Sequence, residues 1–192
     1  DYDDANYDIT SYSVDTLGAG VSIGYPISET SSLNYGLTVS QDSLNSGTYT
    51  VPSILEFMAN NGGDYTQADF TNVKASIGWG ESSLNRAILP NRGFSQSLTL
   101  QTTVPAASDL EFYKLDYRGQ HFTPVSKQTA LRLHTELGYG DGFGDTDGLP
   151  FYENYFAGGI SSVRGFRNGS LGPRAVASLA FPNISSNPNQ LP

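Results

Sequence analysis

Several acidic side chains are gathered in one short segment of this 192-residue chain, where they could bind a metal ion. Asp141, Asp145 and Asp147 lie in the sequence DGFGDTDG, which suggests a calcium loop. An EF-hand loop needs oxygen ligands at its first, third and fifth positions and a glutamate at its twelfth. Counted from Asp141, the third position is Phe143, whose side chain has no oxygen. The segment is therefore predicted to be a Gly/Asp loop in solvent, and we expect no metal there.

Histidine and serine side chains could support two other chemistries, a zinc site and a nucleophile. His121 and His134 are 13 residues apart, and no second pair of ligands of the kind that a zinc site needs accompanies them. Ser161 and Ser162 lie near Arg164, but the sequence places no His–Asp pair to activate either hydroxyl. We therefore expect no catalytic residue, no metal and no cofactor, and a function that is not enzymatic.

The most informative segment is the glycine-rich stretch 155–171, YFAGGISSVRGFRNGSL, with Val163, Arg164, Gly165 and Phe166 at its centre. Val and Phe favour burial, Gly permits a tight backbone turn, and a buried Arg needs a carboxylate or several other acceptors. This combination predicts a long loop that folds back into a partly enclosed polar space and places Arg164 there. A wide membrane β-barrel is one of the few architectures with such an interior.

Composition excludes several classes of function. The net charge is −9 and the isoelectric point about 4.4, which argues against a nucleic-acid partner because phosphate binding needs clustered Lys and Arg. Cysteine is absent, which excludes disulfides and thiolate ligands. No run approaches the roughly 20 apolar residues of a membrane helix. The first residues, DYDDANYDIT, lack the features of a signal peptide, and we expect the chain to be an excerpt of a longer protein.

Six segments alternate apolar and polar residues with the period of a β-strand. Between the second and third, the segment 51–59, VPSILEFMA, could form a short helix within a loop. No other segment has a helical period. The six segments predicted to be strands are 17–27, 33–40, 73–80, 94–104, 113–118 and 131–139.

Alternating strands of this kind fit either a soluble β-sandwich or barrel, or a membrane barrel. Strands of about 10 to 13 residues match a tilted membrane crossing, and short connections alternate with long ones, except at 105–109. Aromatic residues also lie near strand ends, as in interfacial girdles. We therefore favour a membrane barrel whose apolar faces meet lipid. The residues predicted to line its interior are Lys114, Asp116, Arg118, Arg132, His134 and Glu136.

Several of these segments together resemble the BamA family of outer-membrane β-barrel assembly factors. The run 149–159 is LPFYENYFAGG, the run 163–166 is VRGF and the run 171–174 is LGPR. The supporting segments are GYPI at 24–27, LPNRG at 89–93 and GYGDG at 138–142. The similarity covers nearly the whole chain. The VRGF motif is shared with the two-partner-secretion transporters of the same superfamily, whereas FYEN and LGP favour the assembly factors.

The resemblance implies a sixteen-stranded antiparallel transmembrane barrel preceded by POTRA repeats. This all-β chain would be a partial arc of about six strands, roughly the sixth to the eleventh, without the POTRA repeats. The expected division is a loop remnant at 1–12, the strands at 13–139 and a long extracellular loop at 140–192. The residues expected to support that loop are Phe151, Tyr152, Glu153, Asn154, Gly158, Gly159, Gly172 and Pro173.

In the family, the arginine of VRGF contacts acidic residues on the inner wall, on strands that follow the loop. That role transfers to Arg164, and within this chain Asp116 and Glu136 are the candidate interior partners by pattern. The resemblance implies insertion of nascent β-barrel proteins into the lipid of a Gram-negative outer membrane, with assembly lipoproteins as partners of the full-length protein. A polypeptide-translocating pore of the two-partner-secretion type remains the alternative.

Overall fold

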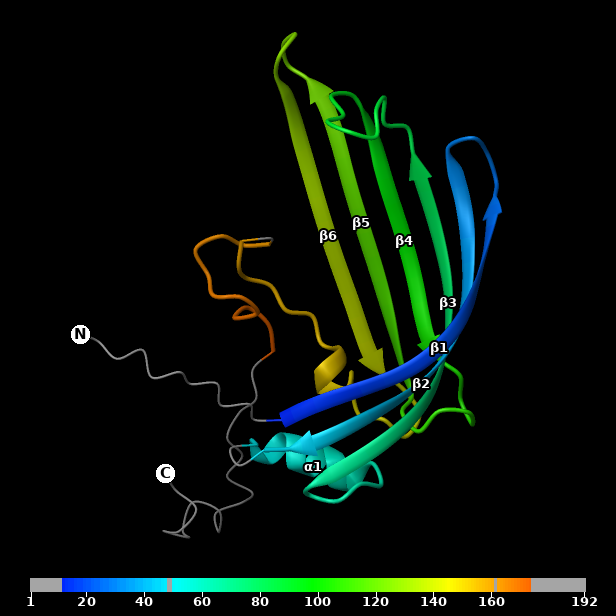
Figure 1. Ribbon diagram of the computed structural model, residues 1–192, viewed down its shortest axis with the longest axis vertical. Helices are drawn as coiled ribbons and strands as arrows, with labels where there is room; N and C mark the ends of the chain where they lie inside the picture. Colours follow the sequence, from blue (N-terminus) through cyan, green and yellow to red (C-terminus); the bar gives the residue numbers. More distant parts are fainter. Residues whose placement is uncertain (1–11, 48–49, 161, 174–192) are drawn as a thin grey trace, which may run out of the picture. The chain divides into compact units, whose positions relative to one another are not determined.

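The computed structural model describes residues 12–47, 50–160 and 162–173. The described residues form six strands, one α-helix and one short 3-10 helix (Figure 1). This confirms the six predicted strands, and the segment between the second and third that could form a short helix is α-helical. The predicted loop remnant, apart from Tyr12, and the last part of the predicted long loop, 174–192, lie outside the described residues. The elements are β1 (Tyr12–Pro26), β2 (Ser31–Ser46), α1 (Pro52–Asn60), β3 (Gln67–Ser82), β4 (Gly93–Thr103), β5 (Phe112–Pro124), β6 (Ala130–Gly142) and η1 (Phe151–Glu153).

The strands form one sheet in the order β1-β2-β3-β4-β5-β6, so each strand neighbours the next one along the chain (Figure 1). The pairs β3–β4, β4–β5 and β5–β6 are antiparallel. The strands contain 11 to 16 residues, long enough for the tilted membrane crossing that the sequence predicts. None of the described helices is long and apolar enough to cross a membrane.

The chain divides into two compact units. The sheet unit consists of Leu17–Gln41 and Thr71–Glu153. The loop unit consists of Asp1–Thr16, Asp42–Phe70 and Asn154–Pro192.

The register of the sheet unit separates a polar face from an apolar face. Lys114 lies opposite Gln101 on β4 and Gly140 on β6, and polar or small residues continue along this face. Leu115 lies opposite Leu100 and Tyr139 on the other face. Large apolar side chains of that face are exposed, as expected of a wall in contact with lipid. They include Leu17, Val21, Ile23, Tyr35, Leu37, Ile77, Leu98, Leu100, Leu115, Leu131, Leu133 and Leu137.

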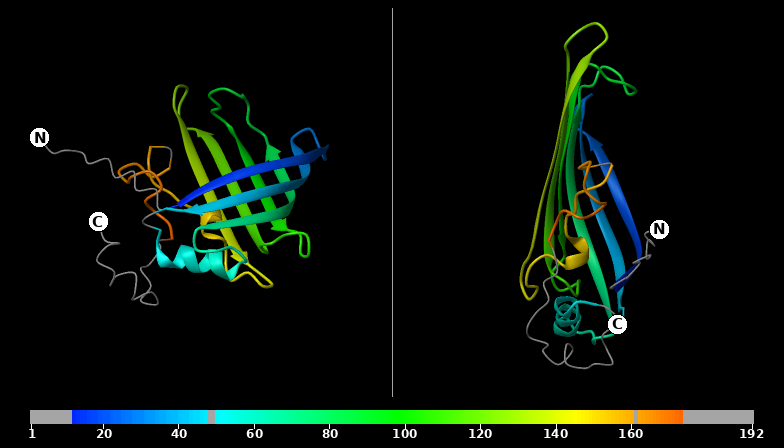
Figure 2. Two further views of the ribbon diagram at one scale, coloured as in Figure 1. Left: turned by 60° about the horizontal axis from the view of Figure 1, so that its bottom comes forward. Right: turned by 90° about the vertical axis from the view of Figure 1, so that its left-hand side faces the viewer.

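The connections between strands of the sheet unit lie at two opposite ends of the strands. Residues 27–30, 83–92 and 125–129 make the connections at one end, the short-turn end (Figure 2). The connection 104–111 lies at the other end, although it is also short. It is the exception that the sequence predicts at 105–109.

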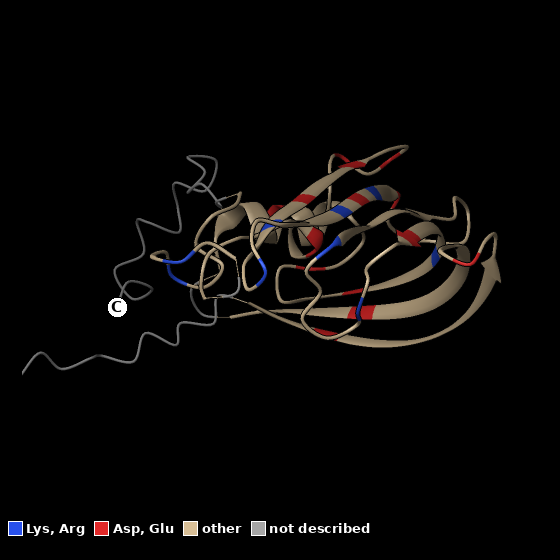
Figure 3. Ribbon diagram, turned by 90° about the horizontal axis from the view of Figure 1, so that it is seen from above, with Lys and Arg blue, Asp and Glu red and all other residues tan. Residues whose placement is uncertain are grey.

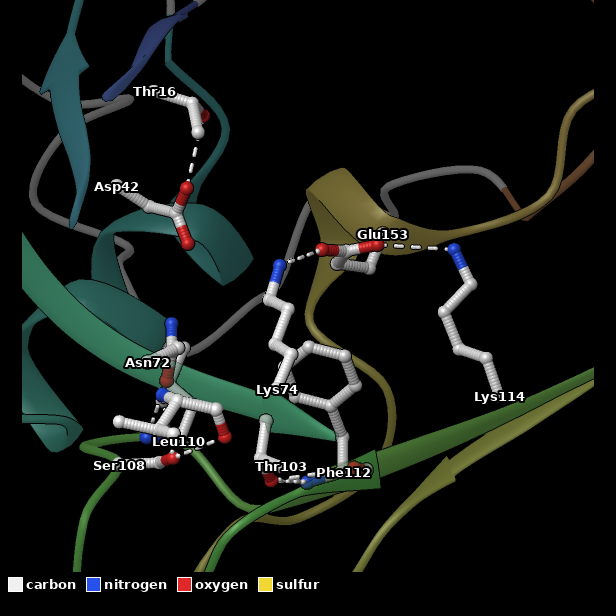
Figure 4. A network of polar contacts seen from close by, with 11 residues as sticks. Thr16, Asp42, Asn72, Lys74, Thr103, Ser108, Leu110, Phe112, Lys114 and Glu153 are labelled. Carbon is white, nitrogen blue, oxygen red and sulfur yellow. Dashed lines mark hydrogen bonds and ion pairs between the residues drawn. The ribbon is translucent and has the colours of Figure 1, made fainter. Parts of the chain in front are cut away.

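The connection 104–111 is held by hydrogen bonds to the first residues of β3 that belong to the sheet unit. Ser108 Oγ accepts a hydrogen bond from the Val73 N–H at 3.0 Å and donates to the Val73 carbonyl at 3.1 Å. The buried Asn72 side chain accepts from the Leu110 N–H at 3.1 Å (Figure 4). Asp109 accepts from the Thr71 N–H at 2.6 Å. The connection is therefore fixed by β3, beyond the end of the β3–β4 ladder.

In the loop unit, α1 packs on its apolar side. Ile54 and Met58 are buried, and the Phe57 ring meets the Phe70 ring edge-on at 5.9 Å between centroids. The helix begins with Pro52 in its first turn and has no side-chain cap at its N-terminus. The N-terminal end of the helix therefore depends on packing, without a side-chain cap.

Candidate functional site

Glu153 is the last residue of η1, a turn that lies within the predicted long loop 140–192. Its N–H donates to the Pro150 carbonyl at 2.9 Å, and the neighbouring Phe151 and Tyr152 rings pack edge to face at 5.4 Å between centroids. This local packing fixes the position at which the Glu153 carboxylate leaves the backbone.

Two lysines from strands of the polar face bind that carboxylate. Lys74 Nζ on β3 lies 2.7 Å from Glu153 Oε1, and Lys114 Nζ on β5 lies 3.0 Å from Glu153 Oε2 (Figure 4). The intervening strand β4 sets the separation of the two lysines, since Lys74 lies opposite Thr103 and Lys114 opposite Gln101. One carboxylate thereby ties η1 to two strands that are not neighbours. We call Lys74, Lys114 and Glu153 the loop anchor.

The loop anchor is largely withdrawn from water, with side-chain exposures of 12% for Lys74, 16% for Lys114 and 19% for Glu153. Burial alone would raise the pKa of the Glu153 carboxyl. The hydrogen bonds and positive charges of Lys74 and Lys114 outweigh burial and hold that pKa below its ordinary value. Glu153 is therefore ionised near neutral pH, and the anchor carries one net positive charge.

The Phe112 ring lies beneath the Lys74 ammonium group and supports its position. Lys74 Nζ lies 5.5 Å from the centroid of the Phe112 ring, within the range of a cation–π contact. The buried Thr103 hydroxyl accepts from the Phe112 N–H at 2.9 Å and donates to the Phe112 carbonyl at 3.3 Å (Figure 4).

Acidic and basic residues also lie close together along the strands, which disperses charge over the sheet (Figure 3).

Within the loop unit, the segment 155–172 closes on itself. Ala157 and Leu171 form an antiparallel bridge with two backbone hydrogen bonds of 2.7 and 2.9 Å. The Gly159 N–H donates to the Phe166 carbonyl at 3.0 Å. The Ser162 hydroxyl accepts from the Gly158 N–H and donates to the Gly158 carbonyl, so this serine has a structural role in the loop.

The VRGF motif forms a tight turn. The Phe166 N–H donates to the Val163 carbonyl at 3.4 Å, and Gly165 has a φ of +92° at the third position of the turn. A residue with a side chain is strained at such a φ, so the turn requires glycine. Arg164, at the second position, has an exposed side chain within the loop unit.

The structure places the other predicted loop-supporting residues near this closed segment. Gly158 and Gly159 have φ values of +114° and +94°, and a Cβ on Gly158 would overlap the Arg167 carbonyl. A Cβ on Gly172 would lie 2.6 Å from the Phe156 ring. Asn154 is half-buried, whereas Pro173 is exposed and is the last residue that the structure describes.

Asp116 and Glu136 lie on the polar face of the sheet unit, as predicted. Asp116 is opposite Thr99 and Gly138, and Glu136 is opposite Arg118 and 3.2 Å from His134 Nε2. Arg164 belongs to the loop unit, and its pairing with either carboxylate stays a prediction.

The two lysines of the loop anchor were not predicted from the sequence as partners of Glu153. Lys114 was expected on the polar face, and Lys74 is the only charged residue among the alternating residues 73–80. An isolated Lys among Ser and Gly on a strand was the available signal. What it could not supply was the partner, which lies 79 residues further along the chain.

The arrangement holds a backbone segment in place through ion pairs and backbone turns. Among the residues that the structure describes, no group of three or more acidic or histidine side chains could hold a metal ion.

Comparison with known proteins identifies the family of the chain. The sequence model of the Omp85 superfamily domain matches residues 1–188. The outer membrane protein assembly factor BamA of Neisseria meningitidis serogroup B is 32% identical over 173 residues, which are 88% of this chain and 22% of that protein. The chain thus spans about a fifth of the length of this relative.

Among solved structures, the crystal structure of BamA from Haemophilus ducreyi lacking POTRA domains 1–3 superposes with a TM-score of 0.76 at 27% identity. The match covers 84% of this chain and 32% of that chain. The six-stranded sheet is therefore a partial arc of a transmembrane β-barrel, located in the outer membrane of a Gram-negative bacterium. With a superfamily match over nearly its whole length, the chain belongs to the Omp85 superfamily.

Proposed function

We propose that this chain is part of the core barrel of the machinery that folds and inserts β-barrel proteins into the outer membrane. The similarity to BamA over 88% of the chain supports assembly as the function. The observation that carries the proposal is the loop anchor, in which Glu153 joins η1, shortly before the VRGF motif, to β3 and β5. A barrel that must deform without losing its interior loop needs such an attachment.

The role of the loop is to stabilise the barrel from inside, and it takes no part in a chemical reaction. The VRGF turn presents Arg164 as a fixed cation, and acidic groups of the inner wall are its partners. Asp116 and Glu136 are the candidates within this chain, and further strands of the barrel supply others. Nascent β-barrel proteins are the substrates, outer-membrane lipid is the surrounding medium, and assembly lipoproteins are partners of the full-length protein.

Assembly would proceed without covalent chemistry. The barrel would lower the barrier to insertion by disturbing lipid beside a weak seam and by offering an exposed strand edge to an incoming strand. The loop anchor keeps the interior loop attached to the wall during these movements.

The test is reconstitution of the natural, full-length protein in liposomes. The quantity measured is the rate at which an unfolded outer-membrane barrel protein becomes folded and protease-resistant. We expect clear acceleration over empty liposomes, and a reduced rate for Arg164→Ala and Glu153→Gln. Arg167→Ala is the matched control, because Arg167 is an exposed arginine three residues away, outside the VRGF turn. No acceleration, with ion conductance or polypeptide passage instead, would contradict assembly and favour the secretion-pore alternative.

A further inference from the structure

A row of polar residues interrupts the apolar face of the sheet unit. Glu81 on β3 lies opposite Gln96 on β4, Gln96 lies opposite Gly119 on β5, and Gly119 lies opposite Thr135 on β6. The rows on either side return to apolar and aromatic residues, with Trp79 and Leu98 on one side. We call these four residues the polar row.

Hydrogen bonds organise one half of the polar row. Gln96 Nε2 donates to Glu81 Oε2 at 3.1 Å, and the Tyr117 hydroxyl donates to Gln96 Oε1 at 3.4 Å. Gly119 provides the room for this arrangement, because a Cβ there would lie 2.8 Å from the Tyr117 hydroxyl oxygen. The Tyr117 ring can therefore lie along the sheet and direct its hydroxyl toward Gln96.

A groove of about 330 Å³ lies over this part of the sheet. Phe94, Gln96, Tyr117, His121, Leu133 and Thr135 are among its lining residues. Its walls thus combine aromatic and aliphatic surfaces with an amide, a phenol, an imidazole and a hydroxyl, and Gln96 connects it to the Glu81 carboxylate.

The charge of Glu81 is not balanced within the described part of the chain. Glu81 is half-buried and accepts a hydrogen bond from Gln96, but no ion pair joins it to any residue that the structure describes. A charged group on the lipid-facing side of a barrel is destabilising to a degree that depends on its depth, and such groups usually have a partner. A cation from outside the chain would balance this carboxylate.

The polar row is near the short-turn end of the strands on its β3–β4 side. Glu81 is one residue from the end of β3, and Gln96 is three residues from the start of β4, which is about 10 Å along a strand. In outer-membrane barrels, short turns are periplasmic. The groove therefore lies where headgroups of the periplasmic leaflet meet the barrel wall.

We propose that this groove binds the headgroup of an amino-phospholipid, such as phosphatidylethanolamine, from the periplasmic leaflet. The primary ammonium donates hydrogen bonds to Glu81 and to Gln96 Oε1, and the phosphate accepts from the His121 and Thr135 side chains. Phe94 and Leu133 contact the first part of the acyl chains. An anionic headgroup without an ammonium would place its negative charge beside Glu81, and a quaternary ammonium could not donate hydrogen bonds. This inference depends on the membrane orientation of the sheet and is independent of the assembly activity.

The experiment is native mass spectrometry of the natural protein in detergent, titrated separately with phosphatidylethanolamine, phosphatidylcholine and phosphatidylglycerol of the same acyl chains. We expect phosphatidylethanolamine to remain bound at detergent concentrations that remove the other two lipids. Glu81→Gln should weaken its retention at least fivefold. Asp141→Asn is the matched control, because Asp141 is an acidic residue on the same face of β6, at the opposite end of the strand.

A second variant distinguishes loss of lipid binding from a defect in folding. Gly119→Ala should displace the Tyr117 ring and weaken phosphatidylethanolamine retention while leaving Glu81 in place. Heat-modifiable migration on gels shows whether each variant is folded. Equal retention of all three lipids, or unchanged retention in the folded Glu81→Gln variant, would overturn the proposal.

Discussion

At the scale of single residues, Glu153 attaches η1 to the sheet through two ion pairs. Its two oxygens each meet a different lysine, and those lysines come from strands separated by β4. Removing the carboxylate would leave two ammonium groups close together and largely withdrawn from water. The loss of folding free energy comes mainly from the unpaired, buried charges that remain, because the ion pairs themselves contribute little net stability.

Glu153→Gln should therefore lower the free energy of unfolding by about 1 to 3 kcal/mol. The temperature of heat-modifiable migration of the natural protein measures this loss. Glu136→Gln is the control, because the contact between Glu136 and His134 is exposed, and we expect a loss below about 0.5 kcal/mol. Equal losses for the two variants would contradict the role of the loop anchor.

The pKa shift of Glu153 also sets a pH dependence. Because its pKa in the folded state is below the ordinary value of 4.5, the stability that it contributes is fully present above that pH. The contribution is lost as the pH falls through the lowered pKa of the folded state. The difference in unfolding temperature between natural protein and Glu153→Gln should thus be constant from pH 7 to pH 5 and shrink in stronger acid. A difference that already shrinks above pH 5 would contradict this assignment.

The second residue on which local structure depends is Gly165. Gly165→Ala places a side chain at a φ of +92° and should cost about 1 kcal/mol within the VRGF turn. Limited proteolysis of the natural protein should then cut the segment 155–172 faster. Gly80→Ala is the matched control, since a Cβ there meets its nearest neighbour at 3.9 Å, and proteolysis of the loop should not change.

At the scale of elements, β3 extends the sheet unit beyond its ladder with β4. The short connection 104–111 has few residues of its own to pack, and β3 supplies the hydrogen-bond partners that its backbone needs. A short connection at this end of the sheet is thus compatible with an ordered rim.

Asn72→Ala tests this dependence on β3. It would leave the N–H of Leu110, itself a buried residue, without the partner that it has at 3.1 Å, and should cost about 1 to 3 kcal/mol of unfolding free energy. Hydrogen exchange of the amides in 104–111 should accelerate. Ser126→Ala removes a comparable but exposed contact in the turn 125–129 and should change stability by less than about 0.5 kcal/mol. Unchanged exchange in Asn72→Ala would show that the connection is ordered by other contacts.

At the scale of the whole molecule, the sheet is open, with β1 and β6 as its two edges. Unpaired backbone groups of an edge strand are costly in lipid and invite pairing with another chain. In the complete barrel, neighbouring strands would satisfy both edges. The arc described here therefore depends on the rest of the barrel for its stability in a membrane.

A polypeptide of these 192 residues alone should associate through its edges or depend on detergent. Chemical crosslinking and size-exclusion chromatography with light scattering in detergent should reveal oligomers, whereas the natural protein serves as the reference for a closed barrel. A monomer that becomes protease-resistant in liposomes would contradict this expectation.

The sequence by itself determined the strands and their two faces. Period-2 alternation is a local property of each strand. The register between antiparallel neighbours places apolar residues opposite one another, as Leu100, Leu115 and Tyr139 show on one face. The glycine of VRGF was also readable, because a tight turn is decided by a few consecutive residues. The segment that forms α1 was identified only as a possible short helix, and it has no side-chain cap at its N-terminus that would strengthen the signal.

Only the tertiary structure decided which distant residues meet. The partners of Glu153 lie 79 and 39 residues earlier in the chain, and nothing in local periodicity relates those positions. The polar row has the same origin, since Glu81, Gln96, Gly119 and Thr135 each look like a minor interruption in their own strand. Strand register brings them side by side, because hydrogen bonding between neighbours fixes which residues share a row. Local sequence thus set the elements, and the pairing of elements set the sites.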